Sequence, residues 1–119
     1  MKYLLMLYAD EKVGISIPPD QMAGFMNQMH AYQQTLEKAG AFVSTAALQT
    51  TDAARTIKIE AGDLKVQDGP YAETREQFGG YYIIEAPDMD GAVELASKCP
   101  AATWGSIEIR AYHPGYAPG

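Results

Sequence analysis

The sequence predicts one α+β domain with an antiparallel sheet over residues 1–119. Two segments, Lys2–Tyr8 and Tyr81–Ala86, are apolar at both alternating sets of positions, which is typical of central strands buried on both faces. Two longer segments repeat apolar residues at helical spacing. The expected order is strand, helix, strand, hairpin, strand, helix, strand. Merging the hairpin into one edge of the sheet gives a βαββαβ arrangement.

A loop is expected from Gly14 to Pro19, and the first helix is expected to run from about Pro19 to Ala39. Pro19 suits the first helical position, and Gly40 is a candidate C-terminal cap. One face of this segment carries an apolar stripe at helical spacing, formed by Met22, Phe25, Met26, Met29, Tyr32, Leu36 and Ala39. A short or irregular strand is expected next, from Phe42–Val43 and Ala47–Gln49.

A hairpin is expected in the middle of the chain. Thr56–Ala61 alternates between polar and apolar residues, with Ile57 and Ile59 pointing inward. Gly62–Asp63 is expected to form the turn, and Leu64–Gln67 alternates again as the second strand.

The last third of the chain predicts one more helix and one more strand. Asp88 is a suitable N-cap for a helix from Met89 to about Cys99, which Pro100 ends. Ile107–Tyr112 then forms a strand with one apolar face. The tail at 113–119 contains two prolines and two glycines, so we expect it to be irregular.

The predicted arrangement is the ferredoxin-like fold, in which the first and third strands of the repeat are central. Two helices cover only one face of such a sheet, so its other apolar face requires a cover. A second copy of the chain is the simplest cover. We therefore expect a homodimer that packs sheet against sheet.

Composition excludes several classes of function. The net charge is −6, and the nine Lys and Arg residues are scattered, which argues against nucleic-acid binding. Cys99 is the one cysteine, so no internal disulfide or zinc cluster is expected. His30 and His113 lack metal-ligand spacing, and we expect no metal and no cofactor. No apolar run approaches the about 20 residues that span a bilayer. With no signal peptide recognised at its start, the chain is expected in the cytoplasm.

Residues 68–82, with the sequence DGPYAETREQFGGYY, carry the most distinctive motif. They resemble the YCII-related family, in particular its branch with a DGPF motif, an ETKE-like run and a glycine pair before a strand. Tyr71 stands here in place of the usual Phe, and Arg75 in place of the usual Lys. The resemblance extends over nearly the whole chain, through KYLLMLY at 2–8, KCPAA at 98–102 and SIEIR at 106–110.

This resemblance implies a ferredoxin-like fold dimerised as an α+β barrel, and a branch with no established reaction. Members are often encoded near, or fused to, sigma factors of the extracytoplasmic-function type, which implies a regulatory association. In a more distant branch, a histidine on the first helix and an aspartate after the second helix are proposed as an active dyad. Met29 and Cys99 occupy those places here, so the resemblance transfers no dyad to this chain.

The polar residues of 68–82 predict a cleft for a small polar or anionic molecule. The Arg75 guanidinium is suited to binding a carboxylate or phosphate. Gly69 and Pro70 shape the loop, and Gly79 and Gly80 allow a ligand or another backbone to approach closely. The candidate cleft residues are Tyr8, His30, Asp68, Glu73, Arg75, Glu76 and Tyr81.

Other interpretations of the same residues stay open. Arg75 could be satisfied by Glu73, Glu76 or Asp68 in a purely structural loop, with the glycine pair forming a β-bulge. His30 could be a plain surface histidine, and Cys99 is expected to be an inert buried thiol. The chain would then be a non-catalytic regulatory or interaction protein. Analogy with other dimeric α+β barrels suggests a third function, a haem-linked or cofactor-independent oxygenase.

Overall fold

The computed structural model describes residues 1–116 and has an α+β fold. Its strands are β1 (Lys2–Ala9), β2 (Phe42–Ala47), β3 (Arg55–Glu60), β4 (Asp63–Asp68), β5 (Gln77–Glu85) and β6 (Ser106–Ala111). Its helices are α1 (Glu11–Ile15), α2 (Pro19–Lys38) and α3 (Met89–Ser97), with 3₁₀ turns η1 (Thr51–Ala53) and η2 (Pro100–Thr103). No helix in the described part of the chain is long and apolar enough to cross a membrane. The predicted irregular tail shows only a turn at 114–116, and its last three residues lie outside the described range.

The main sheet confirms the ferredoxin-like prediction. Its four antiparallel strands lie in the order β2-β5-β1-β6, so β1, α2, β2, β5, α3 and β6 form the βαββαβ repeat. The two segments that are apolar on both faces are the central strands, β1 and β5. Leu5 of β1 lies opposite Tyr82 of β5 and Ile109 of β6.

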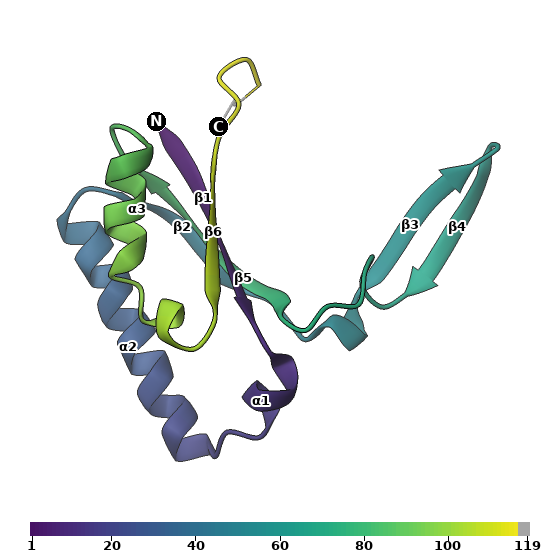
Figure 1. The fold of residues 1–119 in the computed structure, drawn as a ribbon, viewed down its shortest axis with the longest axis horizontal. Coiled ribbons are helices and arrows are strands. Elements are labelled where there is room, and N and C mark those ends of the chain that lie inside the picture. Colours follow the sequence, from purple (N-terminus) through teal and green to yellow (C-terminus); the bar gives the residue numbers. More distant parts are fainter. Residues whose placement is uncertain (117–119) are drawn as a thin grey trace.

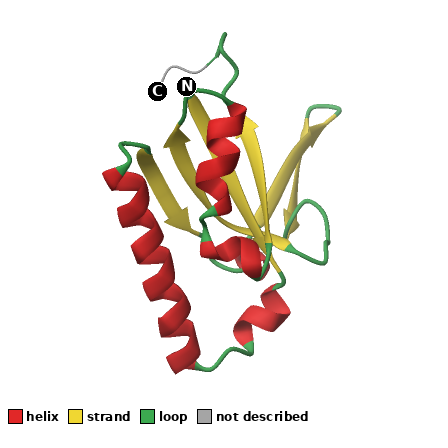
Figure 2. Cartoon of the chain, turned by 60° about the vertical axis from the view of Figure 1, so that its left-hand side comes forward, coloured by secondary structure: helices red, strands yellow, loops and turns green. Residues whose placement is uncertain are grey.

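The core lies between one face of this sheet and the helices α2 and α3, which Figure 2 shows on the near side of the strands. The rings of Tyr32 in α2 and Tyr82 in β5 meet edge to face, with their centroids 5.3 Å apart. The Tyr32 hydroxyl donates a 2.9 Å hydrogen bond to the carbonyl of Leu95, so it also links α2 to α3. The buried apolar side chains include Tyr3, Leu5, Tyr32, Leu36, Tyr82, Ile84, Ala92 and Ala96.

Helix α2 begins and ends close to its predicted limits. Gly40 has φ +69°, and the amides of Gly40 and Ala41 donate to the carbonyls of Glu37 and Leu36, which is the pattern of a Schellman cap. The stripe is buried only toward the C-terminus, at Tyr32 and Leu36. The N-terminal half extends past the end of the sheet (Figure 1), and Met26 there is 45% exposed.

The hairpin forms as predicted, but its placement was wrong. β3 and β4 pair with each other in a separate two-stranded sheet, which projects away from the helices (Figure 1). Ile57 and Ile59, expected to point inward, are 68% and 70% exposed. The reason is that β2, not the hairpin, pairs with β5 at the edge of the main sheet.

The turn of this hairpin lies one residue earlier than predicted. Glu60 and Asp63 are the last paired residues, so Ala61 and Gly62 form a two-residue turn. Both have positive φ, +49° and +84°, as a type I′ turn requires. The sequence pattern missed this because alanine is a rare residue at the first of these positions.

Helix α1 was not predicted, and the loop expected from Gly14 to Pro19 overlaps its last two residues. Asp10 is its N-cap, with Oδ1 accepting a 2.9 Å hydrogen bond from the Lys12 amide. The helix turns the chain from the end of β1 toward α2 (Figure 1). Its single turn is too short for a periodic apolar pattern to show in the sequence.

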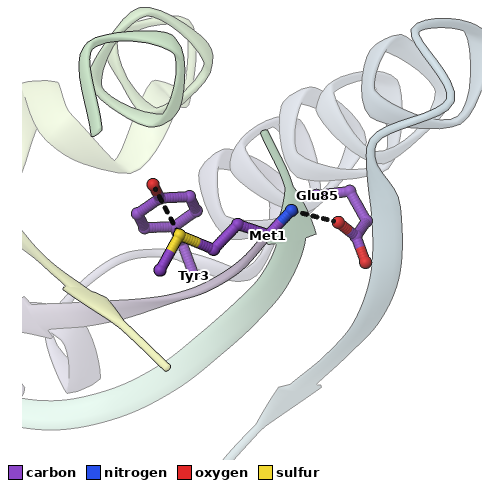
Figure 3. A network of polar contacts seen from close by, with 3 residues as sticks. All are labelled: Met1, Tyr3 and Glu85. Atoms are coloured by element: carbon purple, nitrogen blue, oxygen red, sulfur yellow. Dashed lines mark hydrogen bonds and ion pairs between the residues drawn. The ribbon is translucent and has the colours of Figure 1, made fainter. Parts of the chain in front are cut away.

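The N-terminus is held at the opposite end of the sheet (Figure 3). The ammonium group of Met1 lies 3.0 Å from Oε2 of Glu85, at the end of β5. The Tyr3 hydroxyl donates to the Met1 sulfur at 3.5 Å. Because the ion pair is well exposed, its contribution to stability is at most about 1 kcal/mol.

Candidate functional site

A hollow lies where α1 and the N-terminal half of α2 pass the end of the sheet. We call it the α1–α2 pocket; its volume is about 740 Å³. Trp104, which follows η2, contributes to its wall and packs on Phe25 of α2 with ring centroids 4.8 Å apart. The large apolar side chains of the lining are Leu7, Ile15, Met22, Met26, Met29, Leu48 and Trp104.

The strands below the pocket approach each other closely at the glycine pair. A Cβ on Gly80 would lie 3.1 Å from the carbonyl oxygen of Ala46, so β2 and β5 come unusually near here. Gly79 is the extra residue of a β-bulge, since Leu7 pairs with Gly80 and Tyr8 pairs with Phe78. A β-bulge at the glycine pair was predicted by the interpretation of residues 68–82 as a purely structural loop.

Glu11 of α1 forms hydrogen bonds to two other segments beside the pocket. Its carboxylate accepts hydrogen bonds from the amide and the hydroxyl of Thr51, both at 2.8 Å. Its own amide donates to Oε1 of Gln77 at 2.9 Å. One residue of α1 therefore fixes both η1 and the start of β5. Sequence reasoning missed this role, because the partners lie 40 and 66 residues away.

Five of the residues singled out from the sequence line the α1–α2 pocket. They are Tyr8, His30, Gly79, Gly80 and Tyr81. His30 is exposed and forms no hydrogen bond or ion pair within the described chain. Several lining residues were not singled out, Gln33, Gln49, Gln77 and Trp104 among them.

A second group of predicted residues lies around a smaller hollow of about 320 Å³. Asp68, Gly69, Pro70 and Glu73 line it, and Gln77 lines both hollows. Gly69 has φ +97°, a conformation that glycine adopts without strain, and its carbonyl accepts a 3.0 Å hydrogen bond from the Thr56 hydroxyl. The DGP turn therefore closes the base of the hairpin.

Arg75 and Glu76 line neither hollow. The ion pairs suggested for Arg75 are absent: within residues 1–116 its exposed guanidinium has no hydrogen bond or salt bridge. Asp68 instead pairs with Arg55 at 3.0 Å, and Glu76 accepts a 2.9 Å hydrogen bond from Ser106. The structure thus separates the predicted cleft residues into the pocket group, the hairpin-base group and these two.

The comparisons with known proteins give the family. The model of the YCII-related domain matches residues 1–114, nearly the whole chain. This chain belongs to the YCII-related family. Its relatives include an uncharacterized protein of Rhizobium meliloti (strain 1021), 35% identical over 123 aligned positions that cover 99% of each chain. The name of that YCII-related relative assigns no activity.

The buried titratable groups of this YCII-related domain lie in its core. Burial raises the pKa of the Tyr82 hydroxyl and that of the Tyr32 hydroxyl. Burial also raises the pKa of the Cys99 thiol, which is 2% exposed, so thiolate formation is disfavoured, as expected for an inert cysteine. Across the described residues, no three His, Cys, Asp or Glu side chains gather as a metal ion would require.

Proposed function

We propose that this YCII-related domain binds a small molecule in the α1–α2 pocket. The observation that carries the proposal is a hollow of about 740 Å³ whose surface is mainly apolar, with polar side chains such as His30 and Gln33 also in its lining. Binding sites for small molecules usually have this size and composition. His30 and Gln33 of α2 supply side-chain groups that could orient a ligand.

In this proposal the 68–76 segment is mainly a scaffold. Its Asp68–Tyr71 turn joins the hairpin to the loop before β5. At the start of β5, the side chain of Gln77 accepts a hydrogen bond from the Glu11 amide beside the pocket. We infer from the same motif that the chain belongs to the DGPF branch of the family. A single domain over residues 1–119 and a location in the cytoplasm remain predictions from the sequence.

We also propose a homodimer formed through the uncovered face of the main sheet. Tyr3 and Leu5 are buried under the helices, whereas their neighbours Leu4 and Met6 point to the other face and are half-buried. Ile83 pairs with Leu4 on that face. Apolar side chains on the central strands are suited to contact with an identical surface of a second copy.

A regulatory or interaction protein without chemistry is the second candidate. The projecting hairpin favours it, because Ile57, Ile59, Leu64 and Val66 lie on one of its faces and are 59–70% exposed. Exposed apolar side chains gathered on one element are typical of protein-contact surfaces. This candidate predicts protein partners that depend on the hairpin, and no small ligand in the pocket.

Trp104 makes the proposed binding directly measurable. It is the one tryptophan of the chain, and it lines the pocket. In a small-molecule library, we expect a subset of compounds both to change its fluorescence and to raise the melting temperature. His30→Ala and Met26→Ala should weaken that binding several-fold, whereas Arg75→Ala should leave it unchanged. A library without any responding compound, or ligands insensitive to both pocket variants, would contradict the proposal.

A further inference from the structure

We propose that the α1–α2 pocket takes an uncharged, predominantly apolar molecule with a neutral hydrogen-bonding group. This inference rests on the proposed function and specifies its ligand class. It departs from the polar or anionic ligand that the 68–82 segment suggested.

The charged groups at the pocket are unfavourable for an anion. No Lys or Arg is present among the described residues of its lining, and the two acidic side chains there are Asp10 and Glu11. Asp10 caps α1, and Glu11 holds Thr51 through both carboxylate oxygens. An anionic ligand would lose hydration and face two carboxylates without a cationic partner.

The cationic side chains that could have recognised an anion lie elsewhere. Arg75 lines neither hollow, and Arg55 pairs with Asp68 on the hairpin. Lys12 belongs to α1 but does not line the pocket. The lining therefore has no guanidinium that could bind a carboxylate or phosphate in a bidentate manner.

The apolar wall is suited to an apolar ligand of variable shape. Met22, Met26 and Met29 lie four and three residues apart, so they share one side of α2, and all three line the pocket. Their unbranched thioether side chains change rotamer readily and adapt to a bound molecule. Trp104, supported by Phe25, adds a larger and more rigid surface.

The polar groups at the pocket are mostly uncharged donors and acceptors. Gln33, Gln49 and Thr50 line it together with His30. The side chain of Gln33 bonds Glu37 on the exposed face of α2 at 3.2 Å, a contact that a ligand amide or hydroxyl can replace. Neutral amides and hydroxyls recognise carbonyl, hydroxyl or amide groups without a charge.

A matched pair of probes tests the charge of the ligand. Adamantane-1-carboxamide and adamantane-1-carboxylate have nearly the same shape, and neither absorbs where tryptophan emits, so Trp104 fluorescence can report both. At pH 8, where ordinary imidazole groups are uncharged, we expect the amide to bind at least about tenfold more tightly than the carboxylate. Equal or tighter binding of the carboxylate overturns the inference, and so does the absence of any response to both compounds.

A pair of helix variants tests whether the missing cation sets this preference. Gln33→Lys places an ammonium group at the lining, whereas Gln34→Lys places the same charge on an exposed neighbour outside the lining. We expect Gln33→Lys to raise carboxylate affinity about tenfold and Gln34→Lys to leave it within twofold. The same gain in both variants would assign the effect to net charge and overturn the inference. A library whose pocket ligands are mainly anions would also overturn it while leaving the proposed function intact.

Discussion

At the scale of single residues, Gly105 is the position where the fold leaves no room for a side chain. It precedes β6, and a Cβ built on it would lie 2.0 Å from the carbonyl oxygen of Tyr8. That oxygen belongs to the backbone of β1, so the clash cannot be relieved by moving a flexible side chain. We expect Gly105→Ala to lower the free energy of unfolding by about 3 kcal/mol, the upper end of the usual cost of overpacking.

Gly24→Ala is the matched control for this substitution. Gly24 lies inside α2, is exposed, and has no atom within 4 Å of the position a Cβ would take. Alanine there should raise stability by about 0.5–1 kcal/mol, because it reduces the freedom of the unfolded chain. Urea denaturation of the three proteins measures both effects, and a Gly105→Ala protein as stable as the parent would show that the β1–β6 contact is looser than described.

Residues whose role is local could be predicted from the sequence, and those with distant partners could not. Asp88 caps α3 through its contact with the Gly91 amide, and Gly40 ends α2, because each effect acts within one turn. Gly105 and Glu11 depend on atoms of residues far along the chain. Nothing beside them in the sequence indicates those neighbours.

At the scale of elements, α1 acts through its attachment to η1. The Glu11 carboxylate accepts two hydrogen bonds from Thr51, and these hold the segment between β2 and the hairpin against the helix. We expect Glu11→Ala to destabilise the protein by about 1–2 kcal/mol. We also expect faster hydrogen–deuterium exchange at the Thr51 amide and in α1.

Glu37→Ala is the control for Glu11→Ala, because among the described contacts the side-chain carboxylate of Glu37 bonds only Gln33, on the exposed face of α2. It should change stability by less than about 0.5 kcal/mol and leave exchange at Thr51 unaltered. Unchanged exchange at Thr51 in Glu11→Ala would mean that η1 is held by other contacts.

The hairpin shows why elements were easier to predict than their placement. Alternation at Ile57, Ile59, Leu64 and Val66 indicates two strands with one shared apolar face, and β3 and β4 have this register. The alternation does not indicate which other element of the fold, if any, packs on that apolar face. An inward orientation was assumed, and it failed because the edge position beside β5 is taken by β2. The same limit applied to the cleft: its predicted polar residues fall around two separate hollows, and Arg75 and Glu76 line neither.

At the scale of the whole molecule, the described chain is less compact than its length predicts. Its radius of gyration is 16.3 Å, whereas a compact domain of this length has about 13.5 Å. The projecting hairpin accounts for the excess (Figure 1). Together with the uncovered sheet face, it leaves apolar surface that a second copy could bury. A symmetric dimer would bury this apolar surface on both copies at once.

The proposed dimer predicts that a charge on the uncovered face disrupts association without unfolding the chain. Leu4 lies on a central strand and points away from the helices, so Leu4→Lys should leave the core intact and yield a monomer. Burying two lysines at a symmetric contact is strongly unfavourable. Val93→Lys is the matched control, because Val93 is 49% exposed on α3, the helix packed on the opposite face. Sedimentation equilibrium should show a dimer for the parent and for Val93→Lys, and a monomer of 12.9 kDa for Leu4→Lys. Circular dichroism establishes that each variant is folded, and a parent protein that sediments as a monomer at tens of micromolar would contradict the dimer.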